Sequence, residues 1–179
     1  MSAPKESGKR AIVSSAHLVS ERAAETSAFE YGLYIASNAF NRWITRCMAA
    51  AGYPDLSALD VMVLHTVNHR AKDKKLADIC FVLNIEDSHT VNYALKKLTR
   101  AGLVAGDKRG KEIFYATTEE GQAACEKYRE VREDCLIAAF SAFGGDKAGE
   151  LNEQIGEAAD LLRALSGLYD QAARSASSL

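Results

Sequence analysis

Proline is scarce in this chain of 179 residues, where only Pro4 and Pro54 occur. Because proline interrupts helices, its scarcity leaves long stretches free to be helical. No apolar run reaches the roughly 18 residues that span a bilayer, and no apolar segment of a secretory signal follows the polar start, Met1 to Arg10. We therefore expect a cytoplasmic, mainly helical protein with one compact domain, or one domain plus an extension for dimerisation.

The four cysteines lack the Cys-x-x-Cys spacing of metal and redox motifs and the density of a secreted disulfide framework. They are Cys47, Cys80, Cys125 and Cys135. The simplest interpretation is that they are reduced thiols that pack as small hydrophobic side chains. A thiol redox switch is the alternative, and it requires a lowered pKa at Cys47 or Cys125.

Motifs of the common enzyme classes are also missing. The chain has no glycine-rich phosphate loop, no Gly-x-Ser-x-Gly and no pair of carboxylates in an apolar setting. His65 and His69 have a spacing that can bind a metal, but the zinc-protease glutamate and a third ligand are missing, so packing is the favoured interpretation. We expect no enzyme, no metal and no cofactor.

Charge is distributed unevenly along the chain. Residues 70–111 contain ten basic and five acidic side chains, whereas the rest of the chain contains twelve basic and nineteen acidic ones. A basic middle between acidic flanks is typical of a protein with one phosphate-binding face, although charge alone also fits a solvated surface.

The N-terminal half predicts two helices. Apolar side chains recur at intervals of four and three residues from Phe29 to Cys47, which indicates a helix that ends near Gly52. Ser57 and Asp60 form a capping-box pattern before a segment that is apolar almost all round, so a central buried helix is expected there.

Two short helices and a hairpin are predicted next. The first carries an apolar face of Leu76, Ile79, Cys80 and Leu83, and the second, capped by Asp87, has an inner face of Val91, Ala94, Leu95 and Leu98. Gly102 ends the second helix. Strands at 103–105 and 112–116 then flank a basic turn in which Gly110 supplies the positive φ.

The C-terminal part predicts two long helices. Thr117 and Glu120 suggest a capping box, Phe143 to Gly145 break the first helix, and Leu151 to Tyr169 form a seam suited to helix-on-helix packing.

The predicted fold is mainly α: a winged helix-turn-helix with a two-stranded β-wing, N- and C-terminal dimerisation helices, and six helices in all. The predicted regions are a flexible arm at 1–26, an N-terminal dimerisation helix at 27–56, the winged helix-turn-helix at 57–116, dimerisation helices at 117–173 and a tail at 174–179.

This order of elements suits DNA binding, because a slim helix with a polar outer face can enter the major groove while a basic hairpin meets the flanking backbone. Asn92 could bond adenine, and Arg109 is the first choice for the minor groove. The predicted DNA-binding residues are Ser88, His89, Asn92, Tyr93, Lys96, Lys97, Lys108, Arg109 and Lys111.

The chain resembles the MarR family of winged-helix regulators over about residues 29–169, most specifically in Lys75-Leu76-Ala77-Asp78-Ile79, in the run from Thr90 to Leu98 and in Ala101-Gly102-Leu103-Val104. Within the family it is most similar to the LdtR-like alphaproteobacterial group. The resemblance implies a homodimer, palindromic operators in double-stranded DNA, and repression relieved by a small aromatic ligand.

An effector site is expected between the first two helices, where the resemblance would put it. Its predicted residues are Phe40, Trp43, Arg46, Met62 and His65. Such aromatic stripes are more often core, but Arg46 could hold a carboxylate. A winged helix that docks a protein is the other functional alternative, and it predicts an uncharged or acidic outer face on the second short helix.

Overall fold

The computed structural model describes residues 16–18, 20 and 22–179, so most of the predicted N-terminal arm lies outside the described residues. The chain divides into two compact units, Met1–Tyr128 and Arg129–Leu179. No helix of the described part is long and apolar enough to cross a membrane.

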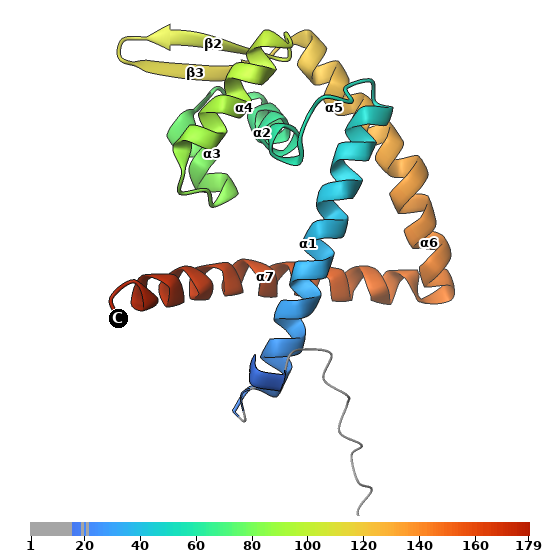
Figure 1. The fold of residues 1–179 in the computed structure, drawn as a ribbon. Coiled ribbons are helices and arrows are strands. Elements are labelled where there is room, and N and C mark those ends of the chain that lie inside the picture. The colour runs from blue at the N-terminus through green and yellow to red at the C-terminus, as the bar shows by residue number, and fades with distance from the viewer. Residues whose placement is uncertain (1–15, 19, 21) are drawn as a thin grey trace, which may run out of the picture. The chain divides into compact units, whose positions relative to one another are not determined.

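The first unit contains the predicted helices α1 (Ala24–Ala50), α2 (Ala58–Asn68), α3 (Leu76–Leu83) and α4 (Ser88–Arg100), the start of α5 (Glu119–Arg132), and a single turn of 3-10 helix at Ala16–Leu18 (Figure 1). Helix α2 packs against α1, α3, α4 and the strand β3 (Glu112–Thr117). Its Ser57–Asp60 capping box is formed as predicted. The central position of α2 explains why its sequence is apolar almost all round, since nearly every face meets another element.

The core of this unit lies around α2. Met48, Leu64, Ile79, Leu95 and Leu98 are among its largest fully buried side chains. They come from α1, α2, α3 and α4, so one core fixes the helices on either side of the turn between α3 and α4. This turn ends α3 with Asn84 in the left-handed region (φ 52°), a conformation that asparagine tolerates better than most residues.

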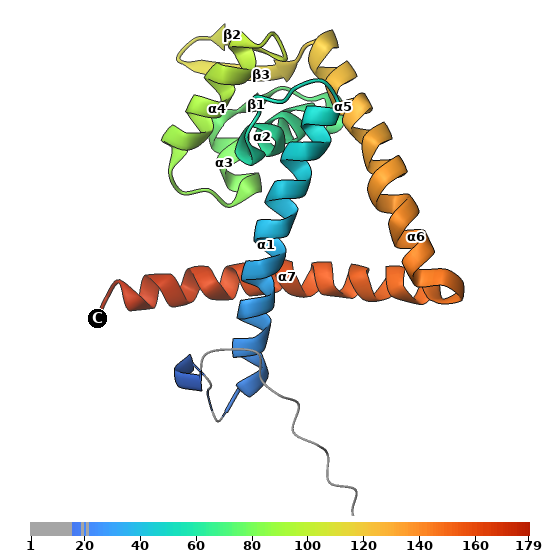
Figure 2. The same ribbon diagram turned by 45° about the vertical axis from the view of Figure 1, so that its right-hand side comes forward.

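The sheet has three antiparallel strands in the order β1-β3-β2, with β1 at Lys74–Lys75, β2 at Val104–Arg109 and β3 at Glu112–Thr117. The predicted two-stranded wing, β2 and β3, is present. Strand β1 falls in the segment that the sequence presents as a basic linker, and it pairs Lys74 with Tyr115 (Figure 2). A strand of two lysines has no alternation of polar and apolar residues, so the sequence pattern could not predict it.

The wing hairpin is longer than predicted. Arg109 pairs with Glu112, so the turn consists of Gly110 and Lys111 alone, and Gly110 takes a φ of 65°. Residues 107–109 are polar and were predicted as turn, yet they are strand. All of β2 beyond Val104 is exposed, so its backbone ladder continues without any need for apolar side chains.

Helix α5 begins one residue later than the predicted capping box implies. Thr118, not Thr117, accepts the hydrogen bond from the backbone N–H of Gly121 (3.0 Å) and donates to the carbonyl of Gly102 (2.6 Å). The hydroxyl of Thr117 donates to Asn68 instead, because Thr117 is still the last residue of β3.

The secondary-structure elements of the second unit are all helical. It holds the end of α5, a π-helical turn at Glu133–Ile137, α6 (Ala138–Gly144), a 3-10 turn at Gly145–Lys147 and α7 (Ala148–Ala176). Counting α5, the π turn and α6 as one helix, the longer helices of the described residues are the six that were predicted. No residue in the described elements of this unit is buried. Its apolar side chains therefore form no buried core within the described elements of this unit.

Candidate nucleic-acid interface

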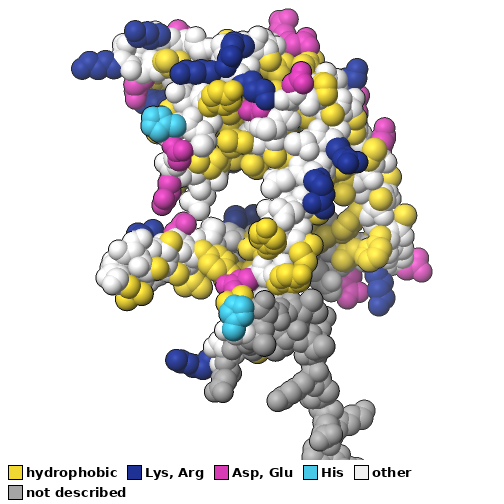
Figure 3. Space-filling model, in the orientation of Figure 1, with side chains coloured by type: hydrophobic (Ala, Val, Ile, Leu, Met, Phe, Trp, Pro, Cys, Tyr) yellow, Lys and Arg dark blue, Asp and Glu magenta, His cyan; other side chains and the backbone are white. Residues whose placement is uncertain are grey.

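Helix α4 is strongly amphipathic. Val91, Ala94, Leu95 and Leu98 are buried, as predicted, whereas Ser88, His89, Tyr93 and Lys96 on the other side are exposed and Asn92 is half-buried. Figure 3 shows Lys and Arg side chains gathered over α4 and the wing on this face of the first unit. The inner face thus fixes the helix to the core and leaves the polar side accessible.

The first turn of α4 is held by Asp87. Its carboxylate accepts the backbone N–H of His89 (2.9 Å), and its carbonyl accepts the hydroxyl of Thr90 (2.8 Å). These bonds satisfy groups that a helix start leaves without intrahelical partners. They fix the direction in which the N-terminal end of α4 leaves the turn.

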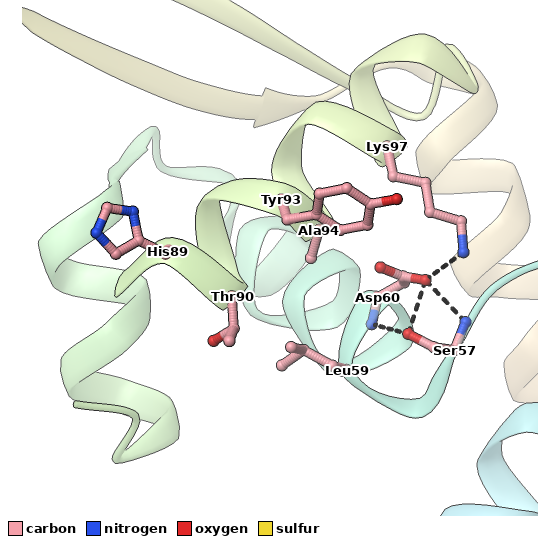
Figure 4. Close-up of a pocket in the computed structure, with 8 residues that line it drawn as sticks. All are labelled: Ser57, Leu59, Asp60, His89, Thr90, Tyr93, Ala94 and Lys97. Atoms are coloured by element: carbon pink, nitrogen blue, oxygen red, sulfur yellow. Dashed lines mark hydrogen bonds and ion pairs between the residues drawn. The ribbon is translucent and has the colours of Figure 1, made fainter. Parts of the chain in front are cut away.

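Lys97, which the sequence predicts as a DNA contact, is paired with other residues of the chain in this structure. Its ammonium group donates to the carboxylate of Asp60 (2.7 Å) and to the carbonyl of Asp55 (2.6 Å). The Asp60 side chain is only 4% exposed and also accepts the N–H and the hydroxyl of Ser57 (Figure 4). A buried carboxylate needs a cation, so Lys97 ties α4 to the start of α2.

Arg109 is already engaged by two carboxylates, one in the wing and one before β1. Its guanidinium donates to Asp73 (2.5 Å) and Asp107 (2.7 Å) and lies 4.7 Å from the ring centre of Phe114. The sequence did not predict Asp73 and Asp107 as partners of Arg109. Asp107 stands two residues before Arg109 on the same strand, so its side chain lies on the same face.

The two lysines of β1, Lys74 and Lys75, make a second set of contacts. Lys75 pairs with Glu112 (2.8 Å) and lies 5.3 Å from the ring centre of Phe114. Lys74 donates to the carbonyls of Val67 and His69, where α2 ends. Lys108 and Lys111, in contrast, are exposed and have no ion pair within the described residues, so they are the freer cations of the wing.

Helix α4 is bordered by two open grooves of about 500 Å³ each. We call the first the α2-side groove; it is lined by Ser57, Leu59, Asp60, His89, Thr90, Tyr93, Ala94 and Lys97 (Figure 4). We call the second the wing-side groove; it is lined by Asn92, Lys96, Thr99, Arg100, Gly106, Ile113 and Tyr115. Helix α4 is therefore a ridge with a hollow on either side.

The five predicted effector residues differ in how exposed their side chains are. Phe40 and Arg46 are exposed on α1, whereas Trp43, Met62 and His65 are half-buried. The three cavities described in the chain, the third being formed by residues of α6 and α7 and the turn between them, are lined by other residues. An effector site at these five residues stays a prediction.

His65 is packed rather than paired. Its ring contacts that of Tyr128 edge-on, with 4.6 Å between the centres, and its buried Nε2 atom has no hydrogen-bond partner among the described residues. Burial lowers the pKa of His65 below its usual 6.5. His69 lies beyond the end of α2 with extended backbone (ψ 125°), so the helical spacing that suggested a metal pair does not hold.

This burial makes a prediction about pH. As the pH falls below about 6.5, unfolded chains protonate His65 while folded ones resist, so the free energy of unfolding decreases. We expect His65→Leu to remove this part of the pH dependence between pH 7.5 and 5.5, measured by chemical denaturation. The exposed His69, changed to Gln, is the control and should keep it. Equal pH dependence in wild type and His65→Leu would contradict the assignment.

The four cysteines are not joined by disulfide bonds in the part of the chain that the structure describes. Cys47 and Cys125 are buried, and burial raises the pKa of Cys125 to about 11. A redox switch needs the opposite shift, so Cys125 is not a reactive thiolate at neutral pH. The Sγ of Cys47 lies 3.5 Å from the carbonyl oxygen of Tyr128, to which it donates, inside the core.

Comparison with known proteins agrees with this architecture. Residues 56–121 match the family model described as a winged helix DNA-binding domain. A search of curated protein sequences finds no match.

Solved structures with a similar fold include MarR of E. coli in its apo form, with a TM-score of 0.60 and 16% identity over 72% of this chain and 95% of that one. A MarR mutant from E. coli in complex with operator DNA has a TM-score of 0.58 and 16% identity over 78% and 99%. A MarR-family regulator of Neisseria meningitidis has a TM-score of 0.55 and 19% identity over 79% and 95%. The chain thus has the fold of these MarR-family regulators, and residues 56–121 match the model of a winged helix DNA-binding domain.

Proposed function

We propose that this protein is a transcriptional regulator of the MarR family that binds specific sites in double-stranded DNA. The observation that carries the proposal is the exposed polar and cationic side of α4 beside a basic wing, in a domain that matches a winged helix DNA-binding model. A helix of this kind has the width and the donor groups to read base edges in the major groove. The role is regulatory rather than catalytic.

Charge and exposure support this proposal over a protein-docking role. A winged helix that docks another protein through α4 calls for an uncharged or acidic outer face. Lys96 and Arg100 on α4 and Lys108 and Lys111 on the wing are exposed cations instead. Such clustered cations favour a polyanion, because binding DNA releases its condensed counterions.

We further propose that the protein works as a homodimer. Phe143 and Leu168 in the second unit are 84% and 58% exposed, and Tyr34 and Phe40 on α1 are 69% and 55% exposed. Patches of large apolar side chains on long helices are typical of surfaces that a partner covers. A second copy of the chain would cover them symmetrically and place two α4 helices about one helical turn of DNA apart.

Three finer assignments belong to the same proposal. Palindromic operators follow from the two-fold symmetry of a dimer. Repression that a small aromatic or carboxylate ligand relieves, and a place in the LdtR-like group, rest on the sequence resemblance. The half-buried Trp43 and Met62, on α1 and α2, supply apolar surface for such a ligand.

Selection of bound sequences from a random duplex pool tests the proposal, with a palindrome of two half-sites roughly 10 base pairs apart as the expected result. On the selected site, Asn92→Ala should relax the preference for one base per half-site. Lys108→Ala removes an exposed wing cation that has no ion pair within the described residues, so it should weaken binding to all sequences, with a readout by fluorescence anisotropy. Recovery of no enriched sequence, or of one without internal symmetry, would contradict the specific or the dimeric part, respectively.

A further inference from the structure

The two grooves beside α4 differ in charge, and this difference has a consequence for how a duplex is held. An α-helix with its side chains is about 10–12 Å wide, and the major groove of B-DNA is about 12 Å wide. When α4 fills the major groove, the two sugar-phosphate backbones must lie along its two sides. The hollows on those sides are the α2-side groove and the wing-side groove.

We propose that the two grooves each hold one DNA strand by different means: the wing-side groove by cations and the α2-side groove by neutral hydrogen-bond donors. The inference rests on the proposed function and assigns Arg100 and Tyr93 specific phosphate partners on opposite strands.

The wing-side groove is the cationic one. Lys96 and Arg100 both line it, and none of its lining residues is acidic. Within the described residues neither side chain forms an ion pair; the Nε of Arg100 donates only to the carbonyl of Lys96 at 3.3 Å. Ile113 and Tyr115 form the opposite, apolar wall on β3. Two uncompensated cations beside an apolar wall suit a phosphodiester strand, whose sugars are apolar and whose phosphates are charged.

The α2-side groove has no net charge to offer. Its only cation, Lys97, is bound to its only carboxylate, Asp60, at 2.7 Å. The groups left for a ligand are neutral donors. Tyr93 is 65% exposed, and its hydroxyl makes no hydrogen bond within the described residues. The ring of the exposed His89 is likewise without a polar partner there.

These two modes of binding differ in their dependence on salt. Each phosphate neutralised by a cation adds about 0.9 to the slope of log K against log salt, whereas a hydrogen bond from a neutral hydroxyl releases no counterion. Salt dependence should therefore arise on the wing side of α4, together with the wing itself, and not on the α2 side.

The test measures duplex affinity of the full-length chain over a range of salt concentrations, by fluorescence anisotropy. Lys96→Gln and Arg100→Gln should each flatten the slope by about 0.9. Tyr93→Phe should weaken binding about two- to tenfold at every salt concentration and leave the slope unchanged, as expected for loss of one hydrogen bond. The control is Lys127→Gln on α5, which removes an exposed cation outside both grooves and should change neither quantity.

The outcomes separate the inference from the function beneath it. A wild-type chain without affinity for any duplex at low salt would end the proposed function and the inference with it. Wild-type binding with an unchanged slope in Lys96→Gln and Arg100→Gln, or a Tyr93→Phe variant that binds like wild type, would overturn the inference alone. Circular dichroism of each variant shows whether it is folded, so a loss of binding can be assigned to the contact.

Discussion

Replacing Gly121 with alanine should destabilise the first unit by at least about 3 kcal/mol, in the range of severe overpacking. A Cβ at this position would lie 2.0 Å from the carbonyl oxygen of Leu103, which is rigid backbone. Helix α5 would have to move away from the start of β2. That movement would strain the bonds from Thr118 to Leu103 (3.1 Å) and to Gly102 (2.6 Å).

Thermal unfolding followed by circular dichroism measures this effect, with a decrease in Tm of roughly 10 °C or more expected for a unit of this size. Gly32→Ala is the matched control. Gly32 also lies within a helix, but a Cβ there has nothing within 4 Å, so alanine should stabilise α1 by about 0.5–1 kcal/mol through its higher helix propensity. Equal melting temperatures for the wild type and Gly121→Ala would show that α5 and β2 do not approach each other as described.

Lys97→Met should cost about 2–4 kcal/mol of folding free energy, because it leaves the carboxylate of Asp60 buried without its cation. The two hydrogen bonds from Ser57 to Asp60 remain, which keeps the loss below that of a wholly isolated charge. At temperatures where the variant is folded, its DNA affinity should keep the salt dependence of the wild type, since Lys97 contacts protein rather than phosphate.

Denaturant titration and a salt series of duplex binding give the two readouts. Adding Asp60→Asn to Lys97→Met should restore much of the stability, because a neutral amide needs no cation and can still accept from Ser57. A stable Lys97→Met variant whose salt slope is flatter by about one would instead return Lys97 to the DNA-contacting residues, where the sequence alone had placed it.

The example of Lys97 shows why the site could be predicted only in part. Helical periodicity placed Val91, Ala94, Leu95 and Leu98 on the inner side of α4, and all four are buried. Periodicity assigns a side chain to a face, but it does not reveal which long side chain at the edge of that face bends back to a partner. Asp60 is 37 residues away in sequence, so its pairing with Lys97 depends on how α2 and α4 pack.

The wing gives a similar lesson. Gly110 and the flanking polarity predicted a hairpin, and β2 and β3 form one. The third strand and the engagement of Arg109 by Asp73 could not be foreseen, because Lys74 and Lys75 become a strand only when β3 lies beside them. A two-residue strand has no period of its own to detect.

The first helix, α1, shows that an apolar pattern can predict a helix without predicting how much of its apolar face is buried. The apolar stripe from Phe29 to Cys47 correctly predicted a helix, which runs from Ala24 to Ala50. Its fully buried apolar side chains, Ile44, Cys47 and Met48, all lie at the C-terminal end. Leu33 and Phe40 stay exposed, so the periodicity identifies an apolar face of the helix but does not show what covers that face.

The amino-acid sequence by itself determined the longer helices, the caps of α2 and α4 and the order of elements, because propensity, periodicity and capping act between residues that are near one another in the chain. Only the tertiary structure decided which cations of the polar face are free, since an ion pair such as Lys97 with Asp60 forms between elements that meet only when the core is packed. The two grooves beside α4 arise in the same way, from the spacing of α2, α4 and the wing, which no local pattern specifies.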